Sequence, residues 1–226
     1  SHDELDMVFV APSTWLAERA RMSPLLKEFE VQVIPNYIDT EFYKPIDRQY
    51  ARKQLSLPNE KQIVAYGAEY PFADRNKGYG LLCDALETLN DIIMPEELEL
   101  VVFGDTEGQE PKLSHPFPTR TIGYLDDTDL QNLYSAADVI AVPSIEENLS
   151  NIILESQACG TPCVAFDAGG TDDIISHKKN GYLAQPYCPK DFASGIIWVL
   201  NQHSKCLSTE ARKTIVENFS PQRVTE

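Results

Sequence analysis

Residues 138–160 read DVIAVPSIEENLSNIILESQACG. The first five predict a buried strand, because a short apolar run rich in β-branched residues stops at Pro143. Ser150 is a typical helix N-cap. The apolar helical pattern after Ser150 ends at the turn that begins at Gly160. The stretch therefore predicts a strand, a loop and a helix in succession.

Two glutamates in this stretch are separated by seven residues. Glu147 lies in the predicted loop, and Glu155 lies about one and a half turns inside the predicted helix. Both carboxylates can therefore face one crevice at different depths. A carboxylate accepts hydrogen bonds from sugar hydroxyls, and the free N–H groups of a helix start attract an anion such as a diphosphate. The arrangement predicts a sugar-nucleotide site.

Apolar strands alternate with helical patterns along most of the remaining chain. The predicted strands are 62–66, 98–104, 120–123, 138–142, 162–166 and 182–184, and the helices between them include 80–86, 126–137 and a short one at 172–176. This alternation predicts an α/β fold, a doubly wound parallel sheet of the Rossmann-like type with helices on both faces. Ligands of such sheets bind at the carboxyl ends of the strands, where Gly67, Gly104, Gly123 and Ser144 fall.

The two ends of the chain follow different patterns. Residues 8–13, 15–29 and 31–35 predict one more strand, amphipathic helix and strand. Residues 210–219 predict a helix near the other end.

Composition excludes several classes of function. The net charge of −16 argues against nucleic acid or an anionic membrane surface as the main partner. The apolar run at 196–200 is far shorter than the roughly 18 residues that a membrane helix requires. Because salt screens charges beyond about 8 Å, an anionic small ligand is still compatible with local groups such as Arg75 and Lys77.

The cysteines and histidines predict neither disulfides nor a metal site. The five cysteines are Cys83, Cys159, Cys163, Cys188 and Cys206. Their odd number and irregular spacing favour a reducing cytoplasm. Cys159 and Cys163 flank a turn, which could indicate a metal or redox pair, but small buried residues are the favoured interpretation. Four scattered histidines form no ligand cluster.

The chain resembles the retaining GT-B glycosyltransferases of family 4, the glycosyl transferases group 1. The glutamate stretch matches the signature of the family, in which proline, serine, two variable residues and a glutamate precede the second glutamate. The other matching segments follow in the order of the family: 33–39 with Phe42 and Pro45, Lys77-Gly78, 133–138, 158–162, Gly169-Gly170 and Asn180-Gly181.

The resemblance implies a role for each site residue. A lysine followed by glycine, here Lys77, contacts the diphosphate, with Arg75 as the nearest arginine. Glu147 would touch the hydroxyls of the donor sugar, and Glu155 would hold those of the ribose. Ile122-Gly123-Tyr124 resembles the segment whose backbone meets the nucleobase. We expect Lys77, Arg75 and Glu147 to be catalytic. The expected donor-binding residues are Gly67, Gly104, Ile122, Tyr124, Asn148, Leu149, Ser150 and Glu155.

Four features depart from the family pattern or leave an alternative. Arg75 is two residues from Lys77, so Lys77 is the safer assignment, and the charged turn alone could be a solvated surface. Glu146 offers a second register beside Glu147. In the family the loop at 148–150 commonly consists of glycine, an aromatic residue, and glycine or proline. The different residues here leave the identity of the donor sugar open, more than the fold. Tyr37 stands where the family often has glycine, which leaves domain closure open.

The resemblance also implies how the chain is organised and what it binds. Residues 1–45 would end an acceptor-side domain and form the linker, 46–206 would form the donor-binding domain, and 207–226 would begin a return helix. We expect a fragment, cut at both ends, of an enzyme that takes a UDP- or GDP-sugar without a metal. Its acceptor would be a lipid-linked or saccharide molecule bound by the missing domain, in polysaccharide or glycolipid synthesis. The expected location is the cytosol or the inner face of the membrane.

Three other functions are compatible with parts of this pattern. A sugar-nucleotide epimerase on the same two-domain fold would require histidine and acidic residues that do not occur in the expected pattern. A non-catalytic sugar-nucleotide-binding module would fit the altered loop 148–150. A nicotinamide-binding domain is disfavoured, because no G-x-G-x-x-G follows the first strand of the sheet. Neither glutamate has a nucleophilic role in the resemblance, so we expect no double displacement.

Overall fold

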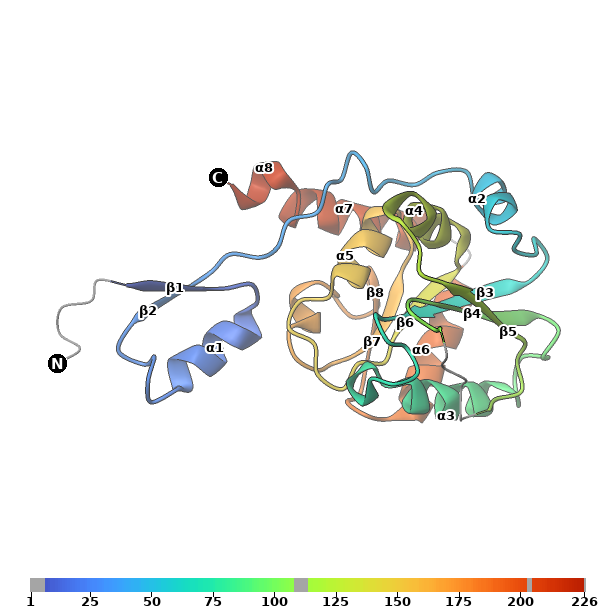
Figure 1. Cartoon of the computed structure of the whole chain (residues 1–226), viewed down its shortest axis with the longest axis horizontal. Coiled ribbons are helices and arrows are strands. Elements are labelled where there is room, and N and C mark those ends of the chain that lie inside the picture. The colour runs from blue at the N-terminus through green and yellow to red at the C-terminus, as the bar shows by residue number, and fades with distance from the viewer. Residues whose placement is uncertain (1–6, 108–113, 203–204, 226) are drawn as a thin grey trace.

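The computed structural model describes residues 7–107, 114–202 and 205–225. They form a small unit and a larger α/β domain (Figure 1). The small unit pairs the parallel strands β1 (Val8–Ala11) and β2 (Glu30–Val33) around α1 (Thr14–Met22). From there an extended segment, 34–47, leads to the larger domain.

The larger domain contains a parallel sheet of six strands. These are β3 (Gln62–Gly67), β4 (Leu98–Phe103), β5 (Thr119–Gly123), β6 (Val139–Val142), β7 (Cys163–Phe166) and β8 (Gly181–Ala184). They lie in the order β5-β4-β3-β6-β7-β8. Every residue of β4, β6 and β7 is buried, as expected for parallel strands covered on both faces. The predicted doubly wound sheet is confirmed.

Helices cover both faces of this sheet (Figure 1). On one face lie α3 (Tyr79–Leu89) and α6 (Pro189–Asn201), whose apolar residues pack with Val64, Val102 and Val164. On the other face lie α2 (Arg48–Gln54), α4 (Asp127–Ala136), α5 (Asn151–Ala158) and α7 (Lys205–Asn218). The short elements are η1 (Arg75–Lys77), η2 (Thr171–Asp173) and α8 (Pro221–Val224).

The boundaries of α5 are as predicted, whereas those of α1 are not. Helix α5 begins after its N-cap Ser150 and ends before Gly160, which has a positive φ of 80°. Helix α1 was expected over 15–29 but ends at Met22. The next residue, Ser23, has an extended conformation (φ −70°, ψ 129°). Pro24 follows it, and a proline disfavours the helical conformation of the residue before it. None of the described helices is long and apolar enough to cross a membrane.

The strand order reverses between β3 and β6. Chain connections therefore leave these neighbouring strands in opposite directions, which opens a crevice beyond their carboxyl ends. The loop after β3 leads through η1 to α3, and the loop after β6 leads to α5. The residues of these two loops are placed side by side by the topology alone.

A buried arginine joins elements at the opposite, amino edge of the sheet. Arg52 is 1% exposed, and its guanidinium donates to the Asp138 carboxylate at 2.9 Å. The same carboxylate accepts from the backbone N–H of Ile63 at 2.7 Å. The guanidinium also donates to the carbonyls of Ala136, Pro58, Asn59 and Lys61. Arg52 therefore links α2 to the starts of both central strands.

We predict that Arg52→Ala lowers the free energy of unfolding by about 3–5 kcal/mol, because it removes the buried partner of the Asp138 carboxylate and leaves several carbonyls without their donor. Arg48→Ala is the matched control, since Arg48 pairs with the same Asp138 but is exposed. It should cost less than about 1 kcal/mol. Urea denaturation followed by circular dichroism measures both values. Equal losses would contradict the structural role of Arg52.

Candidate functional site

Two loops meet in direct backbone contact at the crevice between β3 and β6. The N–H of Ile145, in the loop after β6, donates to the carbonyl of Asn76 at 2.8 Å. Gly78 has a φ of 73°, and a Cβ there would lie 1.9 Å from the carbonyl oxygen of Pro143. Only glycine fits both the conformation and the space. The Lys77-Gly78 pair is therefore fixed against the start of the glutamate loop.

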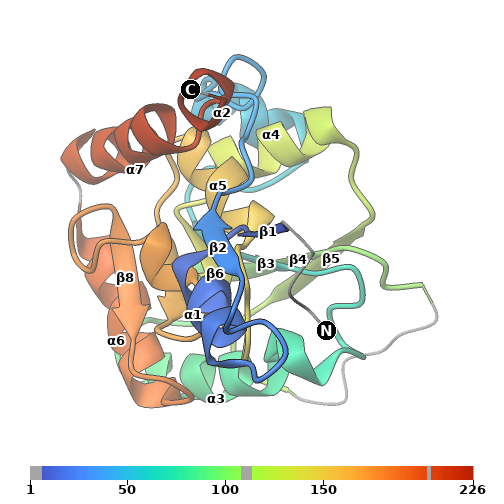
Figure 2. The same ribbon diagram turned by 90° about the vertical axis from the view of Figure 1, so that its left-hand side faces the viewer.

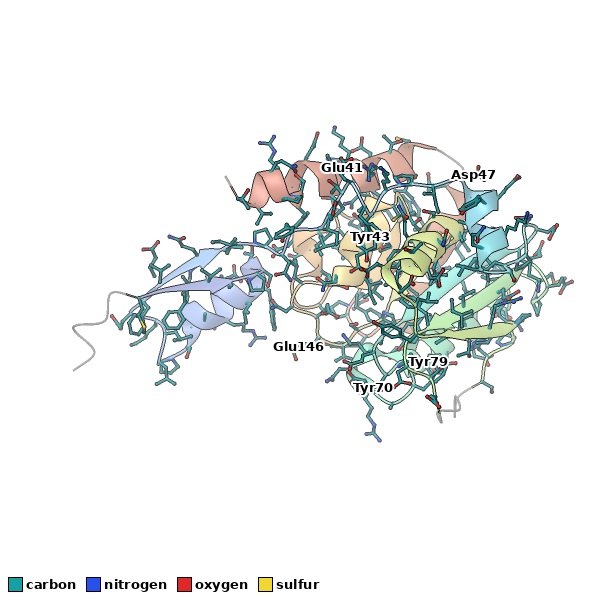
Figure 3. All side chains as sticks on the ribbon, turned by 45° about the horizontal axis from the view of Figure 1, so that its top comes forward. Glu41, Tyr43, Asp47, Tyr70, Tyr79 and Glu146 are labelled. Carbon is teal, nitrogen blue, oxygen red and sulfur yellow. The ribbon has the colours of Figure 1, made fainter. Side chains whose placement is uncertain are left out.

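Across this contact Lys77 reaches Glu147. Lys77 Nζ lies 3.1 Å from Glu147 Oε2, and the two side chains are 33% and 17% exposed. The Ser144 hydroxyl donates to the same oxygen at 3.4 Å. Glu146 is exposed and lies at the surface of the domain in Figure 3. Of the two registers left open by the sequence, Glu147 is the glutamate that faces Lys77.

A third loop, which follows β7, holds the backbone of Glu147 from the other side. The N–H of Gly170 donates to the Glu147 carbonyl at 2.9 Å. Gly169 has a φ of 70°, and a Cβ on it would lie 1.8 Å from the same carbonyl oxygen. The Gly169-Gly170 pair is therefore required for this approach. Loops from three strands thus determine where the Glu147 carboxylate lies.

The start of α5 opens onto the same crevice. Its N-cap Ser150 makes no capping hydrogen bond with its side chain. The predicted N-cap position is confirmed, but the N–H groups of the first turn, 151–153, receive no partner from this hydroxyl. Such groups, together with the positive end of the helix dipole, favour an anion. Lys77 adds a full positive charge nearby.

Glu155 lies deeper, on the same helix. The Tyr134 hydroxyl donates to Glu155 Oε2 at 2.7 Å. Burial raises the pKa of Glu155 to about 7, and the nearby Asp127 adds to this, while the hydrogen bond from Tyr134 opposes it. The carboxylate is therefore close to its titration midpoint at neutral pH. When ionised, it can accept hydrogen bonds from two adjacent hydroxyls.

Four other residues expected to bind the donor lie at the ends of β3, β4 and β5. A Cβ on Gly67 would lie 2.3 Å from the Phe103 ring, and one on Gly104 would lie 1.7 Å from the Ala68 carbonyl oxygen. Ile122 packs against the core. Tyr124 is 83% exposed. Of the four, Tyr124 alone presents a large side chain to solvent, and the other three offer backbone groups.

The loop 148–150 makes contacts that the sequence did not indicate. Leu149 is buried in the core, so its side chain is not directed at a ligand. Asn148 Oδ1 accepts a 2.6 Å hydrogen bond from the hydroxyl of Ser13, at the start of α1. Beside it, the N–H of Thr14 donates to the Asp173 carboxylate at 2.6 Å. The small unit therefore contacts the glutamate loop, and it lies in front of the larger domain in Figure 2.

The side chain of Arg75 does not contact the Lys77–Glu147 pair. It is exposed, and its side chain makes no hydrogen bond or ion pair with the residues that the structure describes. Cys159 and Cys163 are buried free thiols, and burial raises the pKa of each to about 12. Their interpretation as small core residues is confirmed. Within the described ranges no cluster of three or more histidine, cysteine, aspartate or glutamate residues could hold a metal.

Sequence reasoning missed three residues that shape the site. Tyr134 holds Glu155, Ser13 holds Asn148, and the Tyr187 hydroxyl donates to the Ile145 carbonyl at 3.1 Å. Their partners lie 21, 135 and 42 residues away in the chain. In the structure Ser13 is the N-cap of α1, a local role that the sequence can indicate but that does not reveal its contact with Asn148.

A cavity of about 410 Å³ lies away from this crevice, between the linker, α6 and α7. Its lining includes Ser135, Asp138 and Gly160, which follow or end α4 and α5. Carboxyl ends of helices carry partial negative charge and disfavour an anion. Ligands of doubly wound sheets also bind at the carboxyl ends of strands. The crevice at Lys77 and Glu147 is therefore the better candidate site.

Known proteins resemble this chain in its fold and in the sequence of the larger domain. The family model for "Glycosyl transferases group 1" matches residues 60–202. A D-inositol 3-phosphate glycosyltransferase of Saccharomonospora viridis is 28% identical over 211 residues, which cover 87% of this chain and 48% of that protein. The chain spans less than half the length of the curated relatives that it matches.

Two solved structures share the fold. The sucrose-phosphate synthase from Thermosynechococcus elongatus has a TM-score of 0.80 at 24% identity, over 96% of this chain and 55% of that one. HepE from Anabaena, in complex with UDP and glucose, has a TM-score of 0.78 at 23% identity, over 96% of this chain and 60% of that one. At these identities the likeness establishes the arrangement of the chain and no more.

The raised pKa of Glu155 predicts a pH-dependent stability difference. Because the folded-state pKa lies above the ordinary glutamate pKa of 4.5 in the unfolded chain, the folded protein loses stability as pH rises from about 4.5 to about 7. Glu155→Gln removes this loss. The free energy of unfolding of the variant, relative to the wild type, should therefore rise between pH 5 and pH 8 by on the order of 2–3 kcal/mol, because one pKa unit corresponds to about 1.4 kcal/mol. Urea unfolding at both pH values measures the difference, and a constant difference would contradict the shift.

Proposed function

The chain belongs to the glycosyl transferases group 1, and from this premise we propose that it is the donor-binding, C-terminal part of a retaining GT-B enzyme of family 4. The enzyme moves a sugar from a nucleoside diphosphate sugar to an acceptor hydroxyl. The observation that supports this most strongly is the Lys77–Glu147 pair, which lies beside the start of α5 at the point where the strand order reverses.

The diphosphate of the donor binds between Lys77 and the first turn of α5. Negative charge grows on this group as the sugar leaves, and a preorganised ammonium and N–H groups stabilise that charge. In the ligand-free protein the Lys77 ammonium is balanced by Glu147. The phosphates take over this partner, which frees the Glu147 carboxylate to accept from the sugar hydroxyls.

The ribose lies next along the ligand and is held by Glu155. The nucleobase lies beyond it, near Ile122 and the exposed Tyr124, at the end of β5. The donor is a uridine or guanosine diphosphate sugar. The UDP in the HepE complex makes uridine diphosphate the first ligand to test.

Transfer retains the anomeric configuration without a covalent enzyme intermediate. The bond from the anomeric carbon to the β-phosphate oxygen breaks, and the acceptor oxygen bonds to the same face of that carbon. The proton of the acceptor hydroxyl passes to the departing phosphate. Neither glutamate acts as a nucleophile, because Glu147 accepts from the sugar hydroxyls in the donor complex and Glu155 is held by the Tyr134 hydroxyl and the ribose.

The acceptor is bound outside the donor-binding domain. Residues 1–45 belong to the end of the acceptor-side domain and its linker, 46–206 to the donor-binding domain, and 207–226 to the helix that returns toward the first domain. Contacts of Ser13 and Thr14 with Asn148 and Asp173 support this, since they join the small unit to the donor loops. The acceptor is a saccharide or glycolipid, at the cytoplasmic side of the membrane or in the cytosol, and the reaction uses no metal.

Lys77→Ala should weaken binding of UDP or GDP about tenfold or more, because a contact to a charged partner is worth about 1.5–3 kcal/mol. Binding of the nucleosides uridine and guanosine should change much less. Lys53→Ala, on the exposed side of α2, is the control with the same change of charge. Calorimetry compares the four ligands. Equal losses for nucleoside and diphosphate would show that Lys77 is not a phosphate ligand.

The isolated chain should bind a nucleoside diphosphate without transferring sugar, because acceptor recognition belongs to the part of the enzyme beyond these 226 residues. Incubation with UDP-glucose and GDP-mannose, followed by chromatography of the products, tests this. Sugar transfer to an added saccharide by this chain alone would refute the proposed division of labour.

A further inference from the structure

We propose that Tyr134 is a positioning residue for Glu155, which holds one carboxylate oxygen so that the other is presented to the two ribose hydroxyls of the nucleotide. This inference rests on the proposed function. It assigns a specific task to a residue on α4 that has no direct access to the ligand.

The Tyr134 hydroxyl is fixed in place by its surroundings. The side chain is fully buried, with 0% exposure, in the last turns of α4. Its ring and the ring of Phe103 pack in a T-shaped arrangement, with centroids 6.2 Å apart and planes at 81°. On another side lies the ring of Tyr43, with centroids 6.4 Å apart. A ring packed in this way has one position for its hydroxyl, and that position is 2.7 Å from Glu155 Oε2.

Gly67, at the end of β3, contributes to the packing that holds the Tyr134 ring. Phe103 occupies the space where a side chain at residue 67 would lie, since a Cβ on Gly67 would be 2.3 Å from the ring. Gly67 therefore admits Phe103, which packs against Tyr134. Gly67, which the sequence assigned to donor binding, acts in this arrangement through the residues beneath the crevice.

Tyr134 is the decisive partner among the groups that face Glu155. From α4 come Tyr134 and Asp127, from the linker comes Tyr43, and at the end of α5 lies Cys159. The guanidinium of Arg212, on α7, is occupied by the carbonyls of Tyr43, Ala158 and Thr40. Among the described residues, the Tyr134 hydroxyl is the one hydrogen-bond donor to the Glu155 side chain.

This single donor has two effects. It fixes the rotation of the carboxylate about its long axis, which leaves Oε1 for the ligand. It also stabilises the ionised form against burial, and the ionised form is the stronger acceptor for the ribose hydroxyls. Loss of the hydroxyl should therefore raise the pKa of Glu155 and weaken ribose binding at neutral pH.

The test compares Tyr134→Phe with Tyr43→Phe. Each removes one hydroxyl from one of two adjacent rings, but the hydroxyl of Tyr43 donates to Asp127 at 3.3 Å and not to Glu155. The first readout is a carbon-13 NMR titration of the Glu155 carboxyl in the ligand-free chain, with Glu155→Gln to identify the resonance. We expect the Tyr134 variant to raise the pKa from about 7 by about one unit, and the Tyr43 variant to leave it in place.

The second readout is the affinity for UDP and for its 2′,3′-dideoxy analogue between pH 5.5 and pH 8.5, with the guanosine pair measured in parallel. For the wild type, affinity for the ribonucleotide should rise through about pH 7, as Glu155 ionises, whereas affinity for the dideoxy analogue should not. Tyr134→Phe should shift this rise to higher pH and lower the affinity for the ribonucleotide several-fold at pH 7.

Two results would overturn the proposal while leaving the proposed function intact. One is an unchanged Glu155 pKa in the Tyr134 variant. The other is an equal loss of affinity for the ribonucleotide and the dideoxy analogue, which would indicate a purely structural role. If the wild type binds neither UDP nor GDP, the proposed function itself fails, and the ribose role of both residues fails with it.

Discussion

The structure depends on the contact between two loops where the strand order reverses. Strands β3 and β6 are neighbours whose connections leave in opposite directions, so the topology places the loops beyond them side by side, and backbone hydrogen bonds hold the loops together. Ile145 donates to Asn76, and Gly78 allows the Pro143 carbonyl to approach. Lys77 and Glu147 face each other as a consequence of this backbone contact. The site is therefore built by the main chain before any side chain is considered.

The Lys77–Glu147 pair holds an ammonium group in place at the site of an acidic protein. At a net charge of −16 the long-range field repels a diphosphate, but salt screens charges that lie beyond about 8 Å from the site. Inside this range the ammonium and the start of α5 decide the local potential. Glu147 keeps Lys77 in place without a ligand and is itself held by Gly170. A diphosphate can then exchange one anionic partner of the lysine for another.

The sequence predicted the elements well and the contacts between them in part. The alternation of strands and helices and the bounds of α5 follow from periodicity and caps, whereas the assignment of Lys77 and Glu147 to one site came from the family resemblance. The end of α1 was missed because helical periodicity continues past Ser23, whereas the backbone before Pro24 is extended. Tyr134 could not be assigned, because its partner Glu155 lies on a separate helix and no local pattern encodes that pairing.

A crystal structure of the chain with UDP bound would show directly whether the crevice at Lys77 is the donor site. We expect phosphate oxygens about 3 Å from Lys77 Nζ and from N–H groups in the first turn of α5, with the ribose at Glu155. A nucleotide bound elsewhere, for example in the cavity beside Gly160 and Leu207, would contradict this assignment. So would a diphosphate in the crevice with Lys77 still paired to Glu147 alone.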